Sequence, residues 1–348
     1  MNRRMLQHKN ICNRCGLREI PREVYFDSRG ICNLCVLYLN NIQPLLFKQQ
    51  KLGLDYLAKI TKDDQLYNEI NVPISGGVDS SFTAHLAKKY FDVVNLIHVD
   101  TGWNTSQAVR NINAIANSPG FTYRSIVLPW SGQQKMYAAA IRHGINNLDI
   151  IQDNAIFAAL NQYSKNNNIP FWFGQNLRTE FVHFQNWHES YRDILLLWYL
   201  KILSGSWSYK ILPLNSRLLK KKHRPLDYIN YNKDEAMKIL SDEYGYEKYE
   251  EKHSESLFTK FFQNVYAPQK GLIKRLQHEA NLAIVGDREK LPKDLHLELT
   301  QLSRSELFFV FRKLKIEDQL LNNWPEKSLS ARVISMNHLF RIYRKIKK

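Results

Sequence analysis

The chain has 348 residues, of which 44% are hydrophobic and 24% are charged, and its formal net charge is +16 at pH 7. This length and composition suit a soluble globular protein with one large domain or two smaller ones. The positive charge predicts an acidic partner, such as a nucleic acid, a nucleotide or an acidic protein surface. No apolar run approaches the ~20 residues that span a bilayer, and the basic N-terminus leads into no apolar stretch, so we expect a cytoplasmic protein.

All four cysteines lie near the N-terminus at the spacing CxxC-x16-CxxC, as Cys12, Cys15, Cys32 and Cys35. Two CxxC turns can bring four thiolates around one Zn²⁺, which predicts a structural zinc ribbon with no open coordination position. Two disulfides are the alternative, and a cytoplasmic compartment disfavours them. If zinc takes every thiolate, residues 36–348 hold no cysteine that could hydrolyse glutamine or carry sulfur.

The segment PISGGVDSSF, residues 73–82, has the pattern of a strand, a glycine loop and a helix. The helix is expected to begin near Asp79, with Asp79 or Ser80 as its cap. Adjacent glycines let backbone amides approach a ligand, and a helix N-terminus adds partial positive charge, so the loop is predicted to hold phosphate. A chance glycine turn is the alternative, and the Walker pattern GxxxxGK[ST] is absent. The expected phosphate-binding positions are Ser75, Gly76, Gly77, Asp79, Ser80 and Ser81.

Strands and helices alternate after this loop at the spacing of a parallel sheet. Further strands are expected within residues 92–103, 122–129 and 169–176. The predicted fold class is therefore α/β, with a doubly wound, mostly parallel sheet. Because ligands in such sheets bind beyond the carboxyl ends of the strands, one rim is expected to carry Ser75, Asp100, Pro129 and Asn176.

Three regions are predicted along the chain. Residues 1–45 form the zinc ribbon and a linker, residues 46–285 form the catalytic domain, and residues 286–348 form a C-terminal helical region. Within the catalytic domain, the aromatic-rich residues 177–250 are expected to be an insertion on the substrate side. The apolar run Ile194–Leu200 is expected to be a buried helix face.

The segment SGGVDSS is similar to the SGGxDS signature of the PP-loop, or ATP-pyrophosphatase, enzymes, whose fold is of the adenine nucleotide alpha hydrolase type. These enzymes cleave ATP between the α and β phosphates and transfer AMP to a substrate oxygen. The resemblance implies that the loop holds the departing pyrophosphate, with ATP and Mg²⁺ as cofactors and Asp79 as a catalytic residue. It also implies that Asp100 and Thr101, at the next strand end, lie near the adenosine.

The order of the ribbon, SGGxDS, HVDTGWNTSQAVRNI, FWFGQN and KHSESLFTKFFQ resembles the N-acetyl sugar amidotransferase family of lipopolysaccharide and flagellin glycan synthesis. In that chemistry a sugar acetamido oxygen attacks the α phosphate of ATP, and ammonia then displaces AMP from the O-adenylyl imidate to leave an acetamidino group. The residues that the resemblance implies are catalytic Lys252, His253, Glu255, Lys274 and Arg275, and substrate-binding Asn176, Glu180 and Lys260.

Each of these assignments has a structural alternative. Lys260, Lys274 and Arg275 can equally be surface charges, and His253 can be a neighbour of a helix cap. The sequence also departs from the family pattern, because Gln175 stands where the family has the glutamate of a GEN strand end. The stretches APQKGLIKRLQHEANL and IQDNAIF depart from it as well.

Ammonia must come from elsewhere if the ribbon uses every cysteine. The resemblance implies a second polypeptide, namely glutaminase and barrel subunits like those of imidazole glycerol phosphate synthase, beside a nucleotide-linked N-acetyl sugar substrate. Channelling has a physical reason, since free ammonia is mostly protonated at neutral pH and is then no nucleophile. No membrane partner is expected, and a nucleic acid is disfavoured.

Two other functions remain open from the sequence. A tRNA-modifying PP-loop enzyme would adenylate a tRNA base, and the net charge of +16 favours RNA. The tRNA thiolases need cysteines or a cluster in the catalytic domain, however, and lysidine synthetases usually lack a ribbon. A zinc-ribbon binding module with a decayed ATP site is the third candidate, and the intact loop argues against it.

Overall fold

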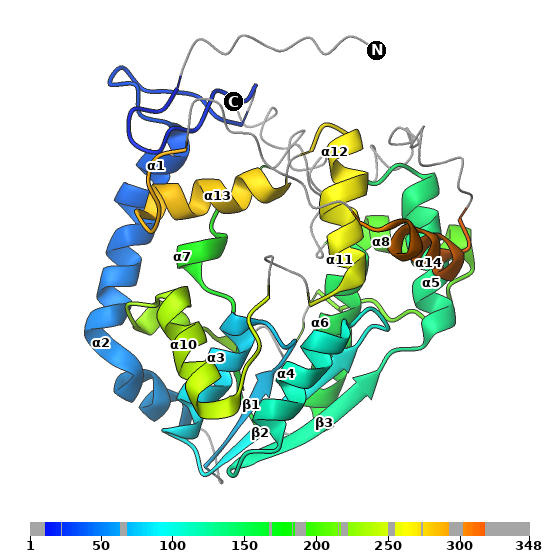
Figure 1. Ribbon diagram of the computed structural model, residues 1–348, viewed down its shortest axis with the longest axis horizontal. Helices are drawn as coiled ribbons and strands as arrows, with labels where there is room; N and C mark the ends of the chain where they lie inside the picture. The colour runs from blue at the N-terminus through cyan, green and yellow to red at the C-terminus, as the bar shows by residue number, and fades with distance from the viewer. Residues whose placement is uncertain are drawn as a thin grey trace.

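The computed structural model describes residues 11–21, 23–62, 68–166, 169–182, 184, 193–214, 216, 222–249, 255–272, 274–291 and 302–316. Its centre is a sheet in which every neighbouring pair of strands is parallel (Figure 1). The strands lie in the order β3 (Phe121–Val127), β2 (Val93–Asp100), β1 (Glu69–Pro73), β4 (Phe171–Trp172) and β5 (Lys222–His223). The predicted α/β class with a parallel sheet is confirmed.

The helices surround this sheet in the following order along the chain: α1 (Asn33–Leu37), α2 (Gln43–Lys62), α3 (Val78–Lys88), α4 (Ser106–Ala116), α5 (Trp130–Arg142), α6 (Asp149–Asn166), α7 (Leu177–Glu180), α8 (Ile194–Ser204), α10 (Lys233–Tyr244), α11 (Leu257–Phe261), α12 (Ala267–Gln269), α13 (Lys274–Val285) and α14 (Arg304–Leu314). Short helical turns of other types are η1 (Tyr38–Ile42), η2 (Pro225–Tyr228) and η3 (Phe262–Tyr266). Of the helices in the described ranges, none has both the length and the apolar composition needed to cross a membrane.

Helices pack on both faces of the sheet because side chains alternate along each strand. Leu96 of β2 packs in one hydrophobic cluster with Phe82 of α3 and Ile112 of α4. Val99 of the same strand points the other way and packs in a second cluster with Leu160 of α6. The sheet is therefore doubly wound, as the sequence predicts.

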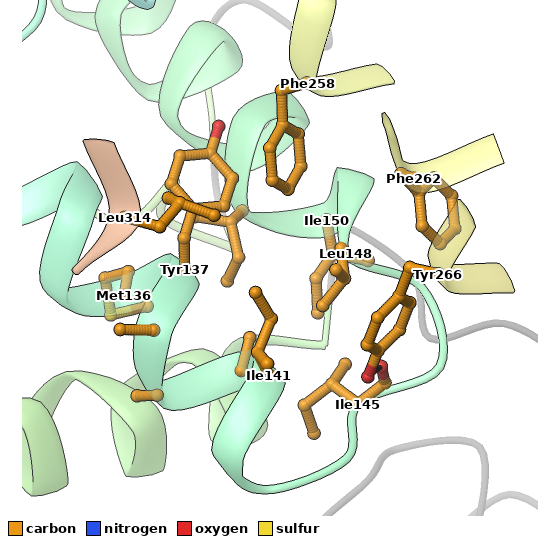
Figure 2. Packing of buried hydrophobic residues seen from close by; sticks show 14 of the residues in the cluster. Met136, Tyr137, Ile141, Ile145, Leu148, Ile150, Phe258, Phe262, Tyr266 and Leu314 are labelled. Atoms are coloured by element: carbon orange, nitrogen blue, oxygen red, sulfur yellow. Dashed lines mark hydrogen bonds between the residues drawn. The ribbon is translucent and has the colours of Figure 1, made fainter. Parts of the chain in front are cut away.

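A large hydrophobic core lies beside the sheet, between α5, the start of α6, α11 and α14 (Figure 2). The rings of Tyr137 and Phe258 are 4.2 Å apart between their centroids, and both side chains are fully buried. The α8 helix adds Leu196, Leu197 and Leu200 to this core. Its expected buried face is confirmed at these residues, although the helix also exposes large apolar side chains on its other face.

The cysteine-rich segment forms a small unit of turns and isolated antiparallel bridges, and it lies against α1 and α13 (Figure 1). Its contact with the rest of the chain includes the backbone, because Leu291 N donates to Cys15 O at 2.9 Å. Ala280 and Ile284 of α13 complete the hydrophobic cluster around the cysteines. The cysteine-rich segment is therefore braced by α13 and by Leu291.

Several element ends differ from the sequence prediction. The α3 helix takes Gly77 as its N-cap, so Asp79 and Ser80 are already in its first turn and the predicted cap is wrong. The strand expected over residues 169–176 has only the residues of β4, and Gly174 beyond it passes close to the backbone of Asp79 and Ser80. The C-terminal region is helical in α14, and residues 317–348 of the predicted domain lie outside the described residues. The three domain boundaries stay predictions.

Candidate functional site

The glycine loop joins the end of β1 to the start of α3, at the carboxyl edge of the sheet. Gly76 has a φ of +82°, and a Cβ there would lie 2.6 Å from Ala108 O of α4. A Cβ at Gly77 would lie 2.4 Å from Glu255 Oε1. Gly76 therefore requires glycine, whereas a side chain at Gly77 would displace the Glu255 carboxylate. The α3 N-terminus that follows gives the loop the partial positive charge that suits phosphate.

Two serine hydroxyls brace this loop. Ser80 Oγ donates to Gly77 O at 3.1 Å and accepts from Ser75 N at 3.2 Å. Gly77 N donates to Ser75 Oγ at 3.3 Å, and the Ser75 side is exposed to solvent. Ser81 differs, because its side chain is fully buried on the core side of α3. Its predicted contact with ATP stays a prediction, and its hydroxyl faces away from solvent.

The carbonyl of Gly76 is held by two tyrosines from a distant part of the chain. Tyr246 Oη donates to Gly76 O at 2.8 Å, and Tyr249 Oη donates to the same oxygen at 3.1 Å. Burial raises the pKa of both phenols, so they remain donors across the physiological range. Because a peptide unit is planar, fixing this carbonyl also fixes the direction of the Gly77 N–H.

The segment that carries these tyrosines is fastened to α4. Asn111 Nδ2 donates to Glu247 O at 3.0 Å, and Asn111 Oδ1 accepts from Glu247 N at 2.8 Å. Asn111 is 1% exposed, so this pair of bonds is shielded from water. The exposed ion pair between Arg110 and Glu247 adds a weaker contact. The loop is thus supported from α4 and from the segment after α10.

Asp79 lies in the first turn of α3 and accepts a hydrogen bond from Tyr231 Oη. Tyr231 is 2% exposed, and burial together with the Asp79 charge raises the pKa of its phenol. This bond fixes the carboxylate at the mouth of the loop. The catalytic role assigned to Asp79 stays a prediction.

Glu255 reaches the loop because its own segment pairs with residues 103–105, which join β2 to α4. Thr105 N donates to Glu255 O at 3.0 Å, and Leu257 N donates to Trp103 O at 2.9 Å. The Glu255 carboxylate consequently lies over Gly77. A carboxylate in that place would repel phosphate unless a cation lay between them, and carboxylate and phosphate oxygens are the ligands that Mg²⁺ prefers. One carboxylate beside a loop that holds phosphates is compatible with Mg²⁺, which stays a prediction.

Asp100 and Thr101 lie at the carboxyl end of β2, on the predicted rim. Asp100 Oδ1 accepts from Gly102 N at 2.7 Å and from Asn104 Nδ2 at 3.0 Å, so the turn after the strand is fixed by this carboxylate. Thr101 Oγ1 donates to Gln152 Oε1 of α6 at 3.3 Å. Their contacts with adenosine stay predictions.

The residues expected to bind substrate have different environments. Asn176 is 2% exposed and caps α7, where its Oδ1 accepts from Thr179 N at 3.0 Å. Glu180 ends that short helix with an exposed side chain, close enough to raise the pKa of Tyr231. Lys260 forms an ion pair with Glu306 of α14 at 3.1 Å. None of these contacts tests a substrate role, so the three assignments stay predictions.

The predicted catalytic cations are also spread apart. Lys274 forms an ion pair with Asp149 at the start of α6, and Arg275 lies 3.9 Å from Glu279 one turn along α13. Arg275 is the more exposed, with 44% of its side chain accessible. Lys252 and His253 lie outside the described residues. All four roles stay predictions.

The four cysteine sulfurs lie within 4.8 Å of one another and all four side chains are buried. The Sγ atoms of Cys12 and Cys35 are 3.8 Å apart, as are those of Cys15 and Cys32. A tetrahedral ion with bonds of ~2.3 Å to sulfur sets its ligands about 3.8 Å apart, whereas disulfide sulfurs are bonded at about 2.0 Å. The cluster therefore fits one Zn²⁺ held by these thiolates and is consistent with a zinc ribbon.

Sequence reasoning missed several residues of the site. Tyr231, Tyr246 and Tyr249 are far from the loop in sequence, and tyrosines in a charged stretch carry no mark of such contacts.

Residues 69–148 match the family described as "Phosphoadenosine phosphosulfate reductase domain". They run from the first strand of the sheet to the residue before α6 and include the glycine loop. No curated protein matches the chain.

Several solved structures are similar. The NH3-dependent NAD synthetase from Campylobacter jejuni subsp. jejuni NCTC 11168, in complex with the nitrate ion, is 16% identical over 82% of this chain and 97% of its own, with a TM-score of 0.36. The NMN synthetase from Francisella tularensis is 12% identical over 73% and 97%, with a TM-score of 0.37. A predicted subunit of tRNA methyltransferase from Methanocaldococcus jannaschii DSM is 18% identical over 59% and 89%, with a TM-score of 0.33.

Likenesses at these scores support no finer assignment. The parallel sheet, the loop at its carboxyl edge and the family match agree on the superfamily. The chain therefore has the α/β fold of the PP-loop, ATP-pyrophosphatase type, with a helical C-terminal region and a cysteine cluster consistent with a zinc ribbon.

Proposed function

We propose that the protein is an ATP-dependent amidotransferase that converts an acetamido group of a nucleotide-linked sugar to an acetamidino group, with release of AMP and pyrophosphate. One observation carries this proposal. The two segments on which the family resemblance rests, TGWNT and KHSESLFTKFFQ, pair with each other beside the ATP loop through Thr105 N to Glu255 O and Leu257 N to Trp103 O. This pairing brings residues 103–105 and 255–257 beside the glycine loop, which supports a substrate site there.

The first half-reaction joins the acetamido oxygen to the α phosphorus and breaks the bond to the β phosphate, while the amide N–H loses its proton. The amides at the start of α3 and the exposed Ser75 hydroxyl would hold the departing pyrophosphate. Glu255 would hold Mg²⁺ there, and the ion would neutralise phosphate charge. Since an amide oxygen is a weak nucleophile, the site must act through positioning and charge stabilisation.

In the second half-reaction ammonia attacks the imidate carbon, the bond from that carbon to the AMP oxygen breaks, and the nitrogen loses a proton. This gives the acetamidine and AMP. The ammonia would come from glutaminase and barrel subunits, because no cysteine lies in residues 36–348 to attack glutamine within this chain.

The test measures AMP and pyrophosphate from the purified chain with Mg-ATP, in parallel with ammonium salt plus nucleotide-linked diacetamido sugars and with bulk tRNA. AMP that depends on a sugar, with a product lighter by the difference between O and NH, is the expected result. AMP formed only with tRNA would replace the proposal with tRNA modification. If neither substrate gives AMP even with the glutaminase partners present, the enzyme assignment itself is wrong.

A further inference from the structure

Two carboxylates outside the ATP loop share one face of α6. Asp149 and Asp153 are one helical turn apart, and Gln152 lies on the same face between them. Gln152 Oε1 accepts from Thr101 Oγ1 at 3.3 Å and from Ser256 Oγ at 3.4 Å. These two partners are the immediate neighbours of Asp100 and Glu255, so this face of α6 adjoins the rim of the ATP site.

Some buried polar atoms in this region have no hydrogen-bond partner. Asp149 is 7% exposed, and its ion pair with Lys274 uses Oδ2. Within the described part of the chain, Asp149 Oδ1 is buried with no hydrogen-bond partner, and the same is true of the fully buried Tyr137 hydroxyl. Tyr137 packs in one hydrophobic cluster with Leu148 and Ile150, the two neighbours of Asp149. Burial raises the pKa of Tyr137, the charges of Tyr209, Asp149 and Asp153 raise it further, and the indole N–H of Trp103 lowers it. Buried polar atoms without partners need an explanation, and an ion bound beside them is one.

The balance of charges around Asp149 and Asp153 also favours the binding of a cation. Asp153 receives no hydrogen bond or ion pair from the residues that the structure describes, and Lys274 supplies one positive charge against two carboxylates. The groups that face Asp153 are Asp149 on its own helix, Tyr137 of α5, Tyr209 after α8 and Lys274 of α13. Burial and the Asp149 charge raise the pKa of Asp153 to about 7, and Lys274 opposes this rise.

We infer that Asp149, Asp153 and the Tyr137 hydroxyl form an ammonium-binding site, in which Asp153 removes the proton that makes ammonium unreactive. The inference rests on the proposed function for its chemistry. One N–H bond of ammonium breaks, its proton goes to an oxygen of Asp153, and neutral ammonia leaves with its lone pair free to attack the imidate carbon. The proton returns to solvent before the next turnover.

A binding experiment tests the site without any turnover. The melting temperature is measured in equal concentrations of ammonium chloride and sodium chloride at pH 8, for the full chain and for Asp153→Asn. Asp242→Asn is the matched control, because it makes the same change on the exposed face of α10. Ammonium should raise the melting temperature of the wild type and of the control more than sodium does, and should lose this advantage in Asp153→Asn. Equal effects of the two salts on the wild type would overturn the site.

Kinetics then separate this inference from the proposed function. Sugar-dependent exchange of pyrophosphate into ATP needs no ammonia, so Asp153→Asn should keep it while its KM for ammonium rises roughly 10- to 100-fold. Its amidination rate should also follow the fraction of free ammonia as pH rises. An unchanged KM and pH profile in Asp153→Asn would refute the role of Asp153. An ammonium effect on melting without any sugar-dependent exchange would leave the site standing and refute the sugar substrate.

Discussion

Glu255 lies directly over Gly77, so that a methyl group on the glycine would come within 2.4 Å of Glu255 Oε1. The two residues are 178 positions apart in the chain and meet because residues 255–257 pair with residues 103–105. A carboxylate from the segment after α10 and the backbone of the glycine loop therefore lie side by side.

Gly77→Ala should weaken ATP binding and AMP formation by about 100-fold, because the added Cβ must displace either the loop or the Glu255 carboxylate. The double variant Gly77→Ala/Glu255→Ala tests the cause. Glu255→Ala removes the carboxylate that would collide with the new Cβ. Gly77→Ala should therefore lower the affinity for ATP much less in the Glu255→Ala protein than in the wild type. Equal costs in both backgrounds would mean that Glu255 does not lie over the loop.

Tyr246→Phe and Tyr249→Phe should each lower the free energy of unfolding by about 1 kcal/mol, since each removes one of the two tyrosine donors to Gly76 O. The double variant should cost more than the sum, because only the 3.5 Å contact from Asn111 would then remain. Urea unfolding and the KM for ATP measure both effects. Tyr25→Phe is the control, because Tyr25 is 64% exposed. Strict additivity of the two changes would contradict the shared acceptor.

Purified protein should contain one zinc ion per chain, and Cys15→Ser should lower both the zinc content and the melting temperature. The melting temperature should fall because the cysteine-rich segment packs against α13 and Leu291, and this packing depends on the bound ion. Elemental analysis and thermal unfolding with and without a chelator measure this. Disulfide-linked peptides in a non-reducing digest of freshly purified protein would contradict the zinc ribbon.

Stability should depend on pH through Asp153. Its pKa in the folded state is about 7, above its ordinary value near 3.9, so the folded chain binds the proton more tightly than the unfolded chain. The contribution of this group therefore falls as pH rises from about 4 to about 7 and is constant above that, a change of up to about 4 kcal/mol. Asp153→Asn should accordingly stabilise the protein at pH 8 and have little effect at pH 4.

Unfolding in denaturant at both pH values measures this, again with Asp242→Asn as the control. A variant that is destabilised equally at pH 4 and pH 8 would show that Asp153 carries no raised pKa.

The sequence was enough to predict the elements whose cause is local. Alternating apolar residues and the SGGVDSS segment predict the parallel sheet and its loop, and the spacing of the cysteines predicts their cluster. The contacts of Tyr246 and Tyr249 with Gly76 could not be predicted, because they join parts of the chain about 170 residues apart. Lys274 looked like a surface charge or a catalytic cation, and only the fold brings this first residue of α13 to Asp149, the first residue of α6.

The most direct test of the proposed chemistry follows an oxygen atom. A nucleotide-linked sugar whose acetamido oxygen is ¹⁸O is incubated with the chain, Mg-ATP and ammonium salt. The mass of the AMP that forms is then measured by mass spectrometry. If the acetamido oxygen attacks the α phosphorus, the bond that later breaks is the one to carbon, so the AMP must carry the label. Unlabelled AMP formed together with an amidinated sugar would contradict the O-adenylyl imidate, and unlabelled AMP with unchanged sugar would contradict the sugar as the substrate.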